Sequence, residues 1–116
     1  MVVRDLANIQ GFSQQCISDE QYEISDAYTG DLLSDVMGNA PSDSVLITIQ
    51  AHKNTVAVAS LAQIRALVIC NNRSIPPDML QAAKEEEIAI FTTEDTQFEA
   101  SCKIASALGR FDAGQN

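Results

Sequence analysis

Two short polar clusters hold the side chains of this sequence that could do chemistry or bind a ligand. The first is YTGD, from Tyr28 to Asp31, and it closely follows Asp26. The second is QAHKN, from Gln50 to Asn54, and it contains His52, the only histidine in the chain. An imidazole can transfer protons or bind a metal, and carboxylates can assist it. An apolar run separates the two clusters, so the fold decides whether they form one site.

Catalysis by these clusters would need a nucleophile and an acid beside His52. Ser34 with Asp26 or Asp31 completes such a set on paper, but a triad is defined by geometry, and the chain has no G-x-S-x-G elbow to position a serine. His52, Asp26 and Asp31 could instead hold a metal if two loops brought them together. The sequence contains no P-loop, so kinase chemistry is not expected. A small enzyme or metal-binding protein that uses His52 with Asp26 or Asp31 is therefore the alternative function.

Binding of an anion or a nucleotide would need fewer side chains to converge than catalysis or a metal site. If a helix begins near Asn54, its first backbone N–H groups are unpaired and carry partial positive charge. His52 and Lys53 would lie beside these groups, and Thr55 would offer a hydroxyl. Gly30 would let the backbone approach a phosphate at the start of the preceding helix. These residues predict a site for a small anionic ligand, while the ligand and any cofactor stay unidentified.

Structural roles explain the same residues. Asp31 and Asn54 are good helix caps, and Gln50 and His52 can hydrogen-bond to loop carbonyls. Asp31 also opposes anion binding, because its carboxylate already supplies negative charge at a helix start. Capping, ligand binding and a partner surface remain as three alternatives. The candidate ligand-binding residues are Asp26, Thr29, Gly30, Asp31, Gln50, His52, Lys53, Asn54 and Thr55.

Composition limits the classes of protein to which the chain can belong. It has 116 residues, 46% of them hydrophobic and 20% charged, which suits one globular domain. The net charge of −9 and the scattered basic residues argue against nucleic acid and anionic membranes as partners. No apolar run approaches the ~18 residues of a membrane span, and the N-terminus lacks the pattern of a secretory signal. We therefore expect a cytoplasmic protein, and three cysteines without C-x-x-C spacing fit its reducing conditions.

Short apolar runs alternate with helical patterns along the chain. Strands are predicted at residues 13–17, 22–29, 44–49, 66–70 and 88–91. Helices are predicted at residues 2–8, 30–38, 54–64 and 77–87, the last of these with Pro77 in its first turn. For TVAVAS, within residues 54–64, a strand is the alternative, because Val56 and Val58 favour strands. A final helix follows Thr93, its predicted cap, and ends before Gly109. Residues 1–110 would form the domain and residues 111–116 a disordered tail.

Apolar spacing in two helices predicts the side chains that face the core. In the helix from residue 30 they are Leu32, Leu33, Val36 and Met37. In the final helix they are Phe98, Cys102, Ala105 and Leu108.

The alternation of strand and helix with short connections indicates a parallel sheet with helices on its faces. Ligands of such sheets bind at the carboxyl ends of the strands. YTGD and QAHKN both follow predicted strands, so we expect them to be neighbours. Arg73, in the NNRS turn, reaches a phosphate there only if the strand order brings its loop to the same place.

Three segments resemble a known family. YTGDLLSDVMGNA, then SVLITIQAHKNTVAVASLAQIRALVIC, and later AAKEEEIAIFTT are similar to the stand-alone DRTGG domain, within residues 22–108 and in one register. The D-R-T-G-G string itself is absent. DAYTGD stands in its place, where Asp26, Thr29 and Gly30 match and Asp31 occupies the position of the second glycine. This departure argues against any role that requires a bare backbone at residue 31.

The resemblance implies a fold and a role. DRTGG domains are similar to the N-terminal domain of HPr kinase/phosphorylase, so we expect an α/β single-domain three-layer sandwich with a mostly parallel central sheet. Such domains occur beside CBS domains in some inorganic pyrophosphatases, where they help to form dimers, and as stand-alone proteins near genes for iron-only hydrogenases. The resemblance therefore implies a non-enzymatic regulatory or accessory module and a homodimer. It would bind a small ligand, such as an adenine nucleotide, or dock on a metabolic enzyme, such as a hydrogenase subunit.

Overall fold

Five strands form one sheet in the computed structural model, which describes residues 1–110. The strand order is β1-β5-β4-β3-β2. The parallel strands are β2 (Asp26–Thr29), β3 (Ser44–Thr48), β4 (Ala66–Ile69) and β5 (Ala89–Thr92). β1 (Ser13–Cys16) pairs with β5 in the antiparallel direction, so β1 and β2 are the edge strands. The mostly parallel sheet predicted from the sequence is confirmed.

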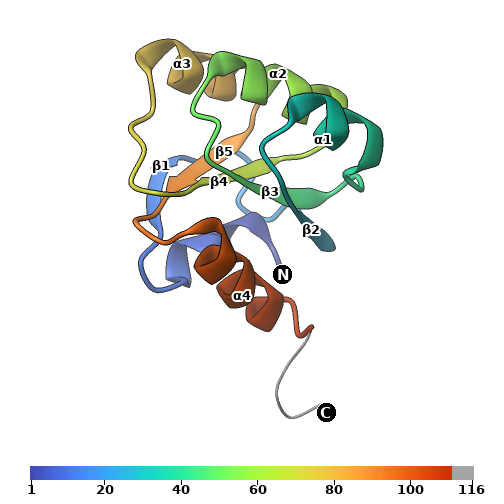
Figure 1. Cartoon of the computed structure of the whole chain (residues 1–116), viewed down its shortest axis with the longest axis vertical. Coiled ribbons are helices and arrows are strands. Elements are labelled where there is room, and N and C mark those ends of the chain that lie inside the picture. Colours follow the sequence, from blue (N-terminus) through green and yellow to red (C-terminus); the bar gives the residue numbers. More distant parts are fainter. Residues whose placement is uncertain (111–116) are drawn as a thin grey trace.

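Helices cover both faces of this sheet (Figure 1). α1 (Leu33–Asn39), α2 (Lys53–Leu61) and α3 (Pro77–Glu85) each connect two neighbouring parallel strands. Such connections have one hand, so the three helices lie together on one face. α4 (Gln97–Ala107) and the 3-10 helix η1 (Val3–Asn8) lie on the other face. The expected single-domain, three-layer α/β sandwich is therefore confirmed.

Two hydrophobic clusters, one on each face of the sheet, make up the core. Ile47 packs with Leu6 of η1 and Ile104 of α4, whereas its neighbour Leu46 packs with Val56 of α2 on the other side. Successive residues of a strand point to opposite faces, and β3 and β4 are buried along their whole length. Burial on both faces explains why these strands are unbroken apolar runs in the sequence.

Several predicted elements have different bounds in the structure. The predicted strand at 22–29 is β2 only over its last four residues, and the segment at 54–64 is helical as α2. α3 begins with Pro77, as predicted. The tail predicted at residues 111–116 lies outside the described residues. Within the described residues, no helix combines the length and the hydropathy that crossing a membrane requires.

The predicted inner face of α1 is wrong in part. Val36 is fully buried, but Leu32 is 68% exposed and Met37 is 40% exposed. α1 has only seven residues, which make about two turns, so it presents few positions to the sheet. Leu32 and Met37 therefore stay at the surface, although both side chains are apolar.

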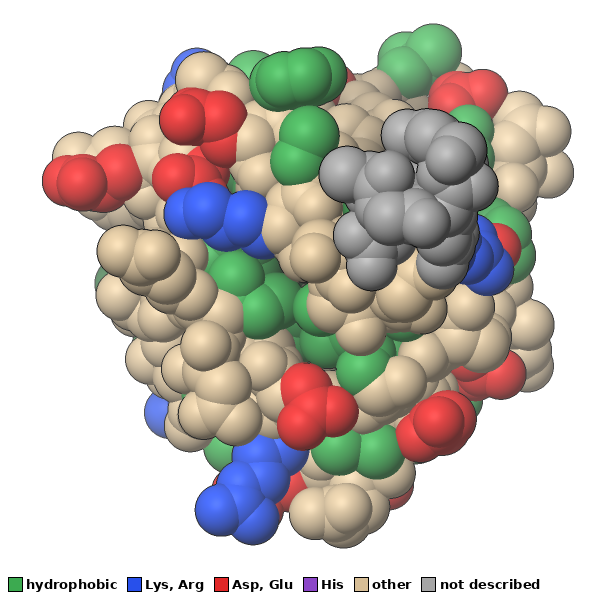
Figure 2. Space-filling model, turned by 90° about the horizontal axis from the view of Figure 1, so that it is seen from below, with side chains coloured by type: hydrophobic (Ala, Val, Ile, Leu, Met, Phe, Trp, Pro, Cys, Tyr) green, Lys and Arg blue, Asp and Glu red, His purple; other side chains and the backbone are tan. Residues whose placement is uncertain are grey.

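α4 meets the sheet with a different side from the predicted one. Ala100 and Ile104 are fully buried, whereas Phe98 is 79% exposed and Cys102 is also exposed. Apolar residues occur on two sides of this helix, and spacing does not say which side meets the sheet. The side with Phe98 and Cys102 therefore stays at the surface. Figure 2 shows that hydrophobic side chains reach the surface on the face of the molecule that carries α4.

The first residue of α4 is set by Thr96 and not by Thr93. The Thr96 hydroxyl accepts the N–H of Glu99 at 3.2 Å, and the Glu99 carboxylate accepts the N–H of Thr96 at 3.0 Å. This reciprocal pair is a capping box, and its T-x-x-E pattern is visible in the sequence. Thr93 is buried in the preceding loop, where its hydroxyl accepts the N–H of Asp95 at 3.1 Å.

Candidate functional site

The carboxyl ends of the parallel strands bring YTGD and QAHKN into contact. The side-chain amide of Gln50 donates to the carbonyl of Asp31 at 3.0 Å, and the N–H of Ile49 donates to the Asp31 carboxylate at 3.0 Å. β2 and β3 are neighbours in the sheet, so the loops that follow them start side by side. The expected juxtaposition of the two clusters is observed.

Asp31 links three elements through its carboxylate. Oδ1 accepts the hydroxyl of Thr48 at 2.9 Å as well as the N–H of Ile49, and Oδ2 accepts the amide of Gln97 in α4 at 2.9 Å. Burial opposes ionisation of this carboxyl. The donors Ile49, Gln97 and Thr48 and the positive charge of Arg73 nevertheless hold the pKa of Asp31 below its ordinary value. The carboxylate is thus charged and engaged by the protein itself.

Asp31 does not cap α1, contrary to the capping alternative. The N-cap of α1 is Leu32, which makes no side-chain cap hydrogen bond. The side chain of Asp31 turns instead toward β3 and α4, because three donors lie there. A carboxylate with these partners is a structural link between the loops.

The QAHKN loop is held rigidly at its start. The hydroxyl of Thr55, which is fully buried, donates to the carbonyl of Gln50 at 2.8 Å. The N–H of Gln50 donates to the hydroxyl of Thr48 at 3.2 Å. Thr55 is therefore occupied inside the protein and offers no hydroxyl to a ligand, contrary to the anion-binding hypothesis. The prediction that Gln50 satisfies a loop carbonyl is consistent with its bond to Asp31.

The exposed side chains of this region lie at the first turn of α2. His52, Lys53 and Asn54 are exposed, and His52 is the N-cap of the helix without a side-chain cap hydrogen bond. Asn54 is the second residue of α2, so it is not the predicted cap. Within residues 1–110, none of these three side chains has a hydrogen-bond or ion-pair partner. They are free to meet a ligand.

Arg73 joins this region from the loop after β4. β4 lies next to β3, and Arg73 is close enough to Asp31 to lower the pKa of that carboxyl. Arg73 is exposed and makes no ion pair within the described part of the chain. The condition stated for Arg73 from the sequence, a suitable strand order, is met. We refer to His52, Lys53, Asn54 and Arg73 as the carboxyl-edge cluster.

Asp26 and Thr29 belong to a different place. Asp26 begins β2, at the opposite end of the strand from Gly30, and its carboxylate pairs with Arg110 at 2.6 Å. The N–H of Ala27, burial of the side chain and then Arg110 act on this group, and its pKa lies below the ordinary value. The hydroxyl of Thr29 lies 2.7 Å from that of Ser101 in α4. Asp26 and Thr29 therefore face α4 and not the carboxyl-edge cluster.

A groove of about 360 Å³ lies between β2 and α4. Two of the predicted site residues, Asp26 and Thr29, line it. The sequence does not reveal the α4 residues of this groove, because their apolar spacing predicts a core-facing side of the helix. The full lining is Asp26, Ala27, Thr29, Ile47, Phe98, Ser101, Cys102, Ala105, Leu108 and Arg110.

The metal site considered from the sequence is not assembled. Among the described residues, no group of three or more histidine, cysteine, aspartate or glutamate side chains is placed to hold a metal ion. His52, Asp26 and Asp31 thus do not converge.

Cys70, buried behind the carboxyl ends of the strands, is a poor nucleophile. Burial first, and then the charges of Asp95 and Asp31, raise the pKa of its thiol to about 11.

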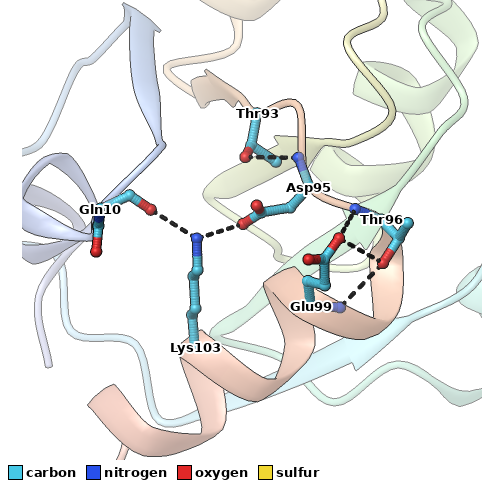
Figure 3. Close-up of polar contacts among 6 residues, drawn as sticks. All are labelled: Gln10, Thr93, Asp95, Thr96, Glu99 and Lys103. Carbon is cyan, nitrogen blue, oxygen red and sulfur yellow. Dashed lines mark hydrogen bonds and ion pairs between the residues drawn. The ribbon is translucent and has the colours of Figure 1, made fainter.

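The start of α4 is anchored by a small polar network (Figure 3). Lys103 pairs with the Asp95 carboxylate at 2.8 Å and donates to the carbonyl of Gln10 at 2.9 Å. It therefore joins α4 to the loop after β5 and to the loop after η1. Together with the capping box, this network fixes α4 beneath the sheet, and α4 in turn supplies Gln97 to Asp31.

Fold and site together define a small α/β domain in which Asp31 links the loop after β2 to β3 and α4. Neither protein-family models nor curated proteins match the sequence. Among solved structures, the chain is similar to the CBS and DRTGG domains of the regulatory region of a pyrophosphatase from Clostridium perfringens, complexed with the activator diadenosine tetraphosphate. The TM-score is 0.73 at 13% sequence identity, over 92% of this chain and 47% of that one. The chain thus spans about half the length of that structure, and it has a DRTGG-like fold.

Proposed function

We propose that this protein is a non-catalytic regulatory or accessory module that binds a small anionic ligand at the carboxyl-edge cluster. One observation carries the proposal. Lys53 and Arg73, two of only seven basic residues in a chain of net charge −9, are exposed and make no ion pair among residues 1–110, at the carboxyl ends of adjacent strands. Lys53 is the first residue of α2, and the N–H groups of this helix start add partial positive charge.

The chemistry of these groups favours a phosphate-bearing ligand. Two cations and a helix N-terminus suit phosphate oxygens, and His52 and Asn54 offer hydrogen bonds beside them. Asp31 makes no ion pair with Lys53 or Arg73 among residues 1–110, because its carboxylate oxygens are engaged by Thr48, Ile49 and Gln97. The similar regulatory region was solved with diadenosine tetraphosphate, so an adenine nucleotide is the first ligand to test.

Thermal unfolding in the presence of ligands tests the proposal. A ligand that binds only the folded chain stabilises it, and a concentration of about 100 Kd contributes roughly 2.7 kcal/mol. We expect one of the adenine mononucleotides, diadenosine polyphosphates or inorganic phosphate to raise Tm by at least about 5 °C. Calorimetry would confirm a single site. The absence of a response to the whole panel would contradict anion binding.

Paired variants locate the site. Lys53→Ala with Arg73→Ala should abolish the ligand-induced rise in Tm, and His52→Ala should weaken it. The matched control is Arg4→Ala with Lys84→Ala, which removes two exposed cations from η1 and α3. If both double variants lost binding equally, the effect would be one of net charge and the carboxyl-edge cluster would not be the site.

Two further proposals concern assembly. Following the family resemblance, we propose that the protein acts in the cytoplasm as a homodimer and that it docks on a metabolic enzyme such as a subunit of an iron-only hydrogenase. Light scattering on the purified chain should give twice the monomer mass of 12.5 kDa. Mixing with purified hydrogenase subunits under reducing conditions should give a co-eluting complex. A monomer in the first experiment and separate peaks in the second would contradict these two proposals.

The enzymatic alternative makes a different prediction. His52 is exposed, and no serine or other side chain among residues 1–110 is hydrogen-bonded to its imidazole. If the protein nevertheless turned over a ligand from the panel, and His52→Ala abolished that turnover, the protein would be an enzyme and not a binding module.

A further inference from the structure

β2 has an unpaired outer side within residues 1–110, where β3 is its neighbour on the inner side. The N–H of Gly30, directly after β2, donates to the carbonyl of Ile47 in β3 at 3.1 Å. Backbone groups alternate in direction along a parallel strand, so the amide groups of Ala27 and Thr29 point away from β3. The N–H of Ala27 accordingly donates to the neighbouring Asp26 carboxylate at 2.8 Å. The carbonyl of Ala27 and both backbone groups of Thr29 have no hydrogen-bond partner among residues 1–110.

α4 runs beside this edge in the opposite direction. Two contacts fix its course: Thr29, at the end of β2, meets Ser101, whereas Asp26, at the start of β2, meets Arg110 just beyond the helix. At 1.5 Å per residue the helix covers about 9 Å from Ser101 to its last residue, Ala107, and β2 covers ~10 Å at 3.3 Å per residue. The groove between β2 and α4 is therefore elongated, with a strand edge on one side and a helix on the other.

The helical side of this groove is an uncovered apolar stripe. Phe98, Cys102 and Ala105 all line the groove and recur at i, i+4 and i+7 along α4, one face of the helix. Phe98 is 79% exposed, which is costly for a side chain of its size without a partner. Two polar contacts, Thr29–Ser101 and Asp26–Arg110, border this stripe, and Phe98 lies about one helical turn beyond Ser101. An apolar stripe bordered by polar contacts is typical of an interaction site.

We propose that β2 and α4 bind an extended peptide segment of a partner protein, which adds to β2 as a sixth strand. The backbone of this peptide hydrogen-bonds to the backbone of Ala27 and Thr29. Alternate side chains of the peptide enter the groove against Phe98 and Cys102. The length of the edge accommodates three to four residues, at about 3.3 Å per residue. Basic side chains flank its apolar positions, because the chain that receives it carries a net charge of −9.

The free backbone groups distinguish a peptide from the other occupants. A small apolar molecule would fill the groove but make no hydrogen bond to the Ala27 carbonyl or the Thr29 amide. A second copy of this chain at the same edge is the other occupant to test, and the Phe98→Ser variant distinguishes it from a peptide. The surface runs along the outer side of β2 and is independent of anion binding at the carboxyl-edge cluster.

Fluorescence anisotropy with a labelled model peptide tests the proposal. The probe is Lys-Val-Thr-Val-Thr-Val-Lys, titrated with the full chain, and saturable binding is expected. Two N-methylated versions of this peptide block the backbone donors on one edge or on the other. One version should bind at least tenfold more weakly, and the other should bind like the parent peptide. No saturable binding, or equal binding of both N-methylated peptides, would overturn strand addition.

Variants and hydrogen exchange locate the bound strand. Phe98→Ser should weaken binding at least fivefold, whereas Leu61→Ser, which changes a 73% exposed side chain on α2, should leave the Kd within twofold. The peptide should slow amide exchange at Thr29 and leave that of Gly30 unchanged. Unchanged exchange at Thr29, or a chain dimer that Phe98→Ser dissociates without any peptide, would overturn the proposal, the latter in favour of a second copy.

Discussion

Asp31 has a structural role, because its carboxylate links two loops and a helix. The DRTGG string that DAYTGD resembles has a glycine at this position. Here the carboxylate joins the loop after β2 to β3, through Thr48 and Ile49, and to α4, through Gln97. An alanine or glycine at residue 31 would leave the buried hydroxyl of Thr48 and the N–H of Ile49 without their acceptor.

Asp31→Ala should therefore destabilise the fold. Each donor that loses its acceptor costs about 1–3 kcal/mol when it stays buried, so we expect a loss of about 2–4 kcal/mol in the free energy of unfolding. Urea unfolding followed by circular dichroism measures it. The control is Glu94→Ala, which removes an exposed carboxylate from the loop between β5 and α4. A loss no larger than that of the control would show that Asp31 is not a structural link.

At the scale of elements, the position of α4 determines the side-chain contacts of β2 and of the loop that follows it. It supplies Gln97 to Asp31, Ser101 to Thr29 and, just after its end, Arg110 to Asp26. Its position depends on Lys103, which bridges Asp95 and the carbonyl of Gln10 (Figure 3). The helix is thus tied to the sheet and to the η1 region at once.

Lys103→Met should loosen this arrangement. Asp95 is only 16% exposed, so removal of the ammonium leaves a poorly hydrated carboxylate, with an expected loss of about 1–3 kcal/mol in the free energy of unfolding. Lys84→Met, on the exposed side of α3, should cost less than about 0.5 kcal/mol.

A double-mutant cycle identifies the cause. Asp95→Asn with Lys103→Met should cost less than the two single changes added together, because the second change removes the unpaired charge that the first one creates. Strict additivity in urea unfolding would mean that the two side chains do not interact in solution, contrary to the ion pair at 2.8 Å.

The whole molecule carries sixteen acidic and seven basic residues, so its stability depends on where protons bind. Asp26 and Asp31 both have a pKa below the ordinary value of 3.8. Groups of this kind bind protons more weakly in the folded chain than in the unfolded chain. Their contribution to stability is therefore complete above pH 3.8 and is lost as the pH falls through their lower, folded values.

The pH dependence of unfolding tests whether Asp26 and Asp31 stabilise the fold above pH 3.8 and lose this effect in acid. Asp26→Asn with Asp31→Asn should be less stable than the natural chain at pH 7, and the difference should shrink between pH 4 and pH 2. Urea unfolding at steps across this range measures both curves, and the other carboxyl groups cancel in the difference. A gap that stays constant down to pH 2 would show that neither group has a lowered pKa in the folded chain.

Strand and helix types followed from the sequence where the physics is local. The β-branched runs of β3 and β4, Pro77 at the start of α3 and the alternation of strand with helix predicted a parallel three-layer α/β domain. The same alternation predicted that YTGD and QAHKN would meet. These features depend on periodicity and on the hand of the connections, which the chain carries in its own pattern.

Tertiary packing alone decided which surfaces are free. The sequence placed Phe98 and Cys102 in the core, but α4 turned Ala100 and Ile104 toward the sheet, because a helix with two apolar sides is oriented by its contacts. The sequence grouped Asp26 with His52. In the structure, Asp26 begins β2, at the end of the strand away from Gly30, and its carboxylate pairs with Arg110. The sequence also did not determine whether the loop of Arg73 would lie near QAHKN. The strand order decides this, because β4 lies beside β3. Local patterns determined the elements and their order, whereas the exposed groups that could bind a partner depended on long-range contacts.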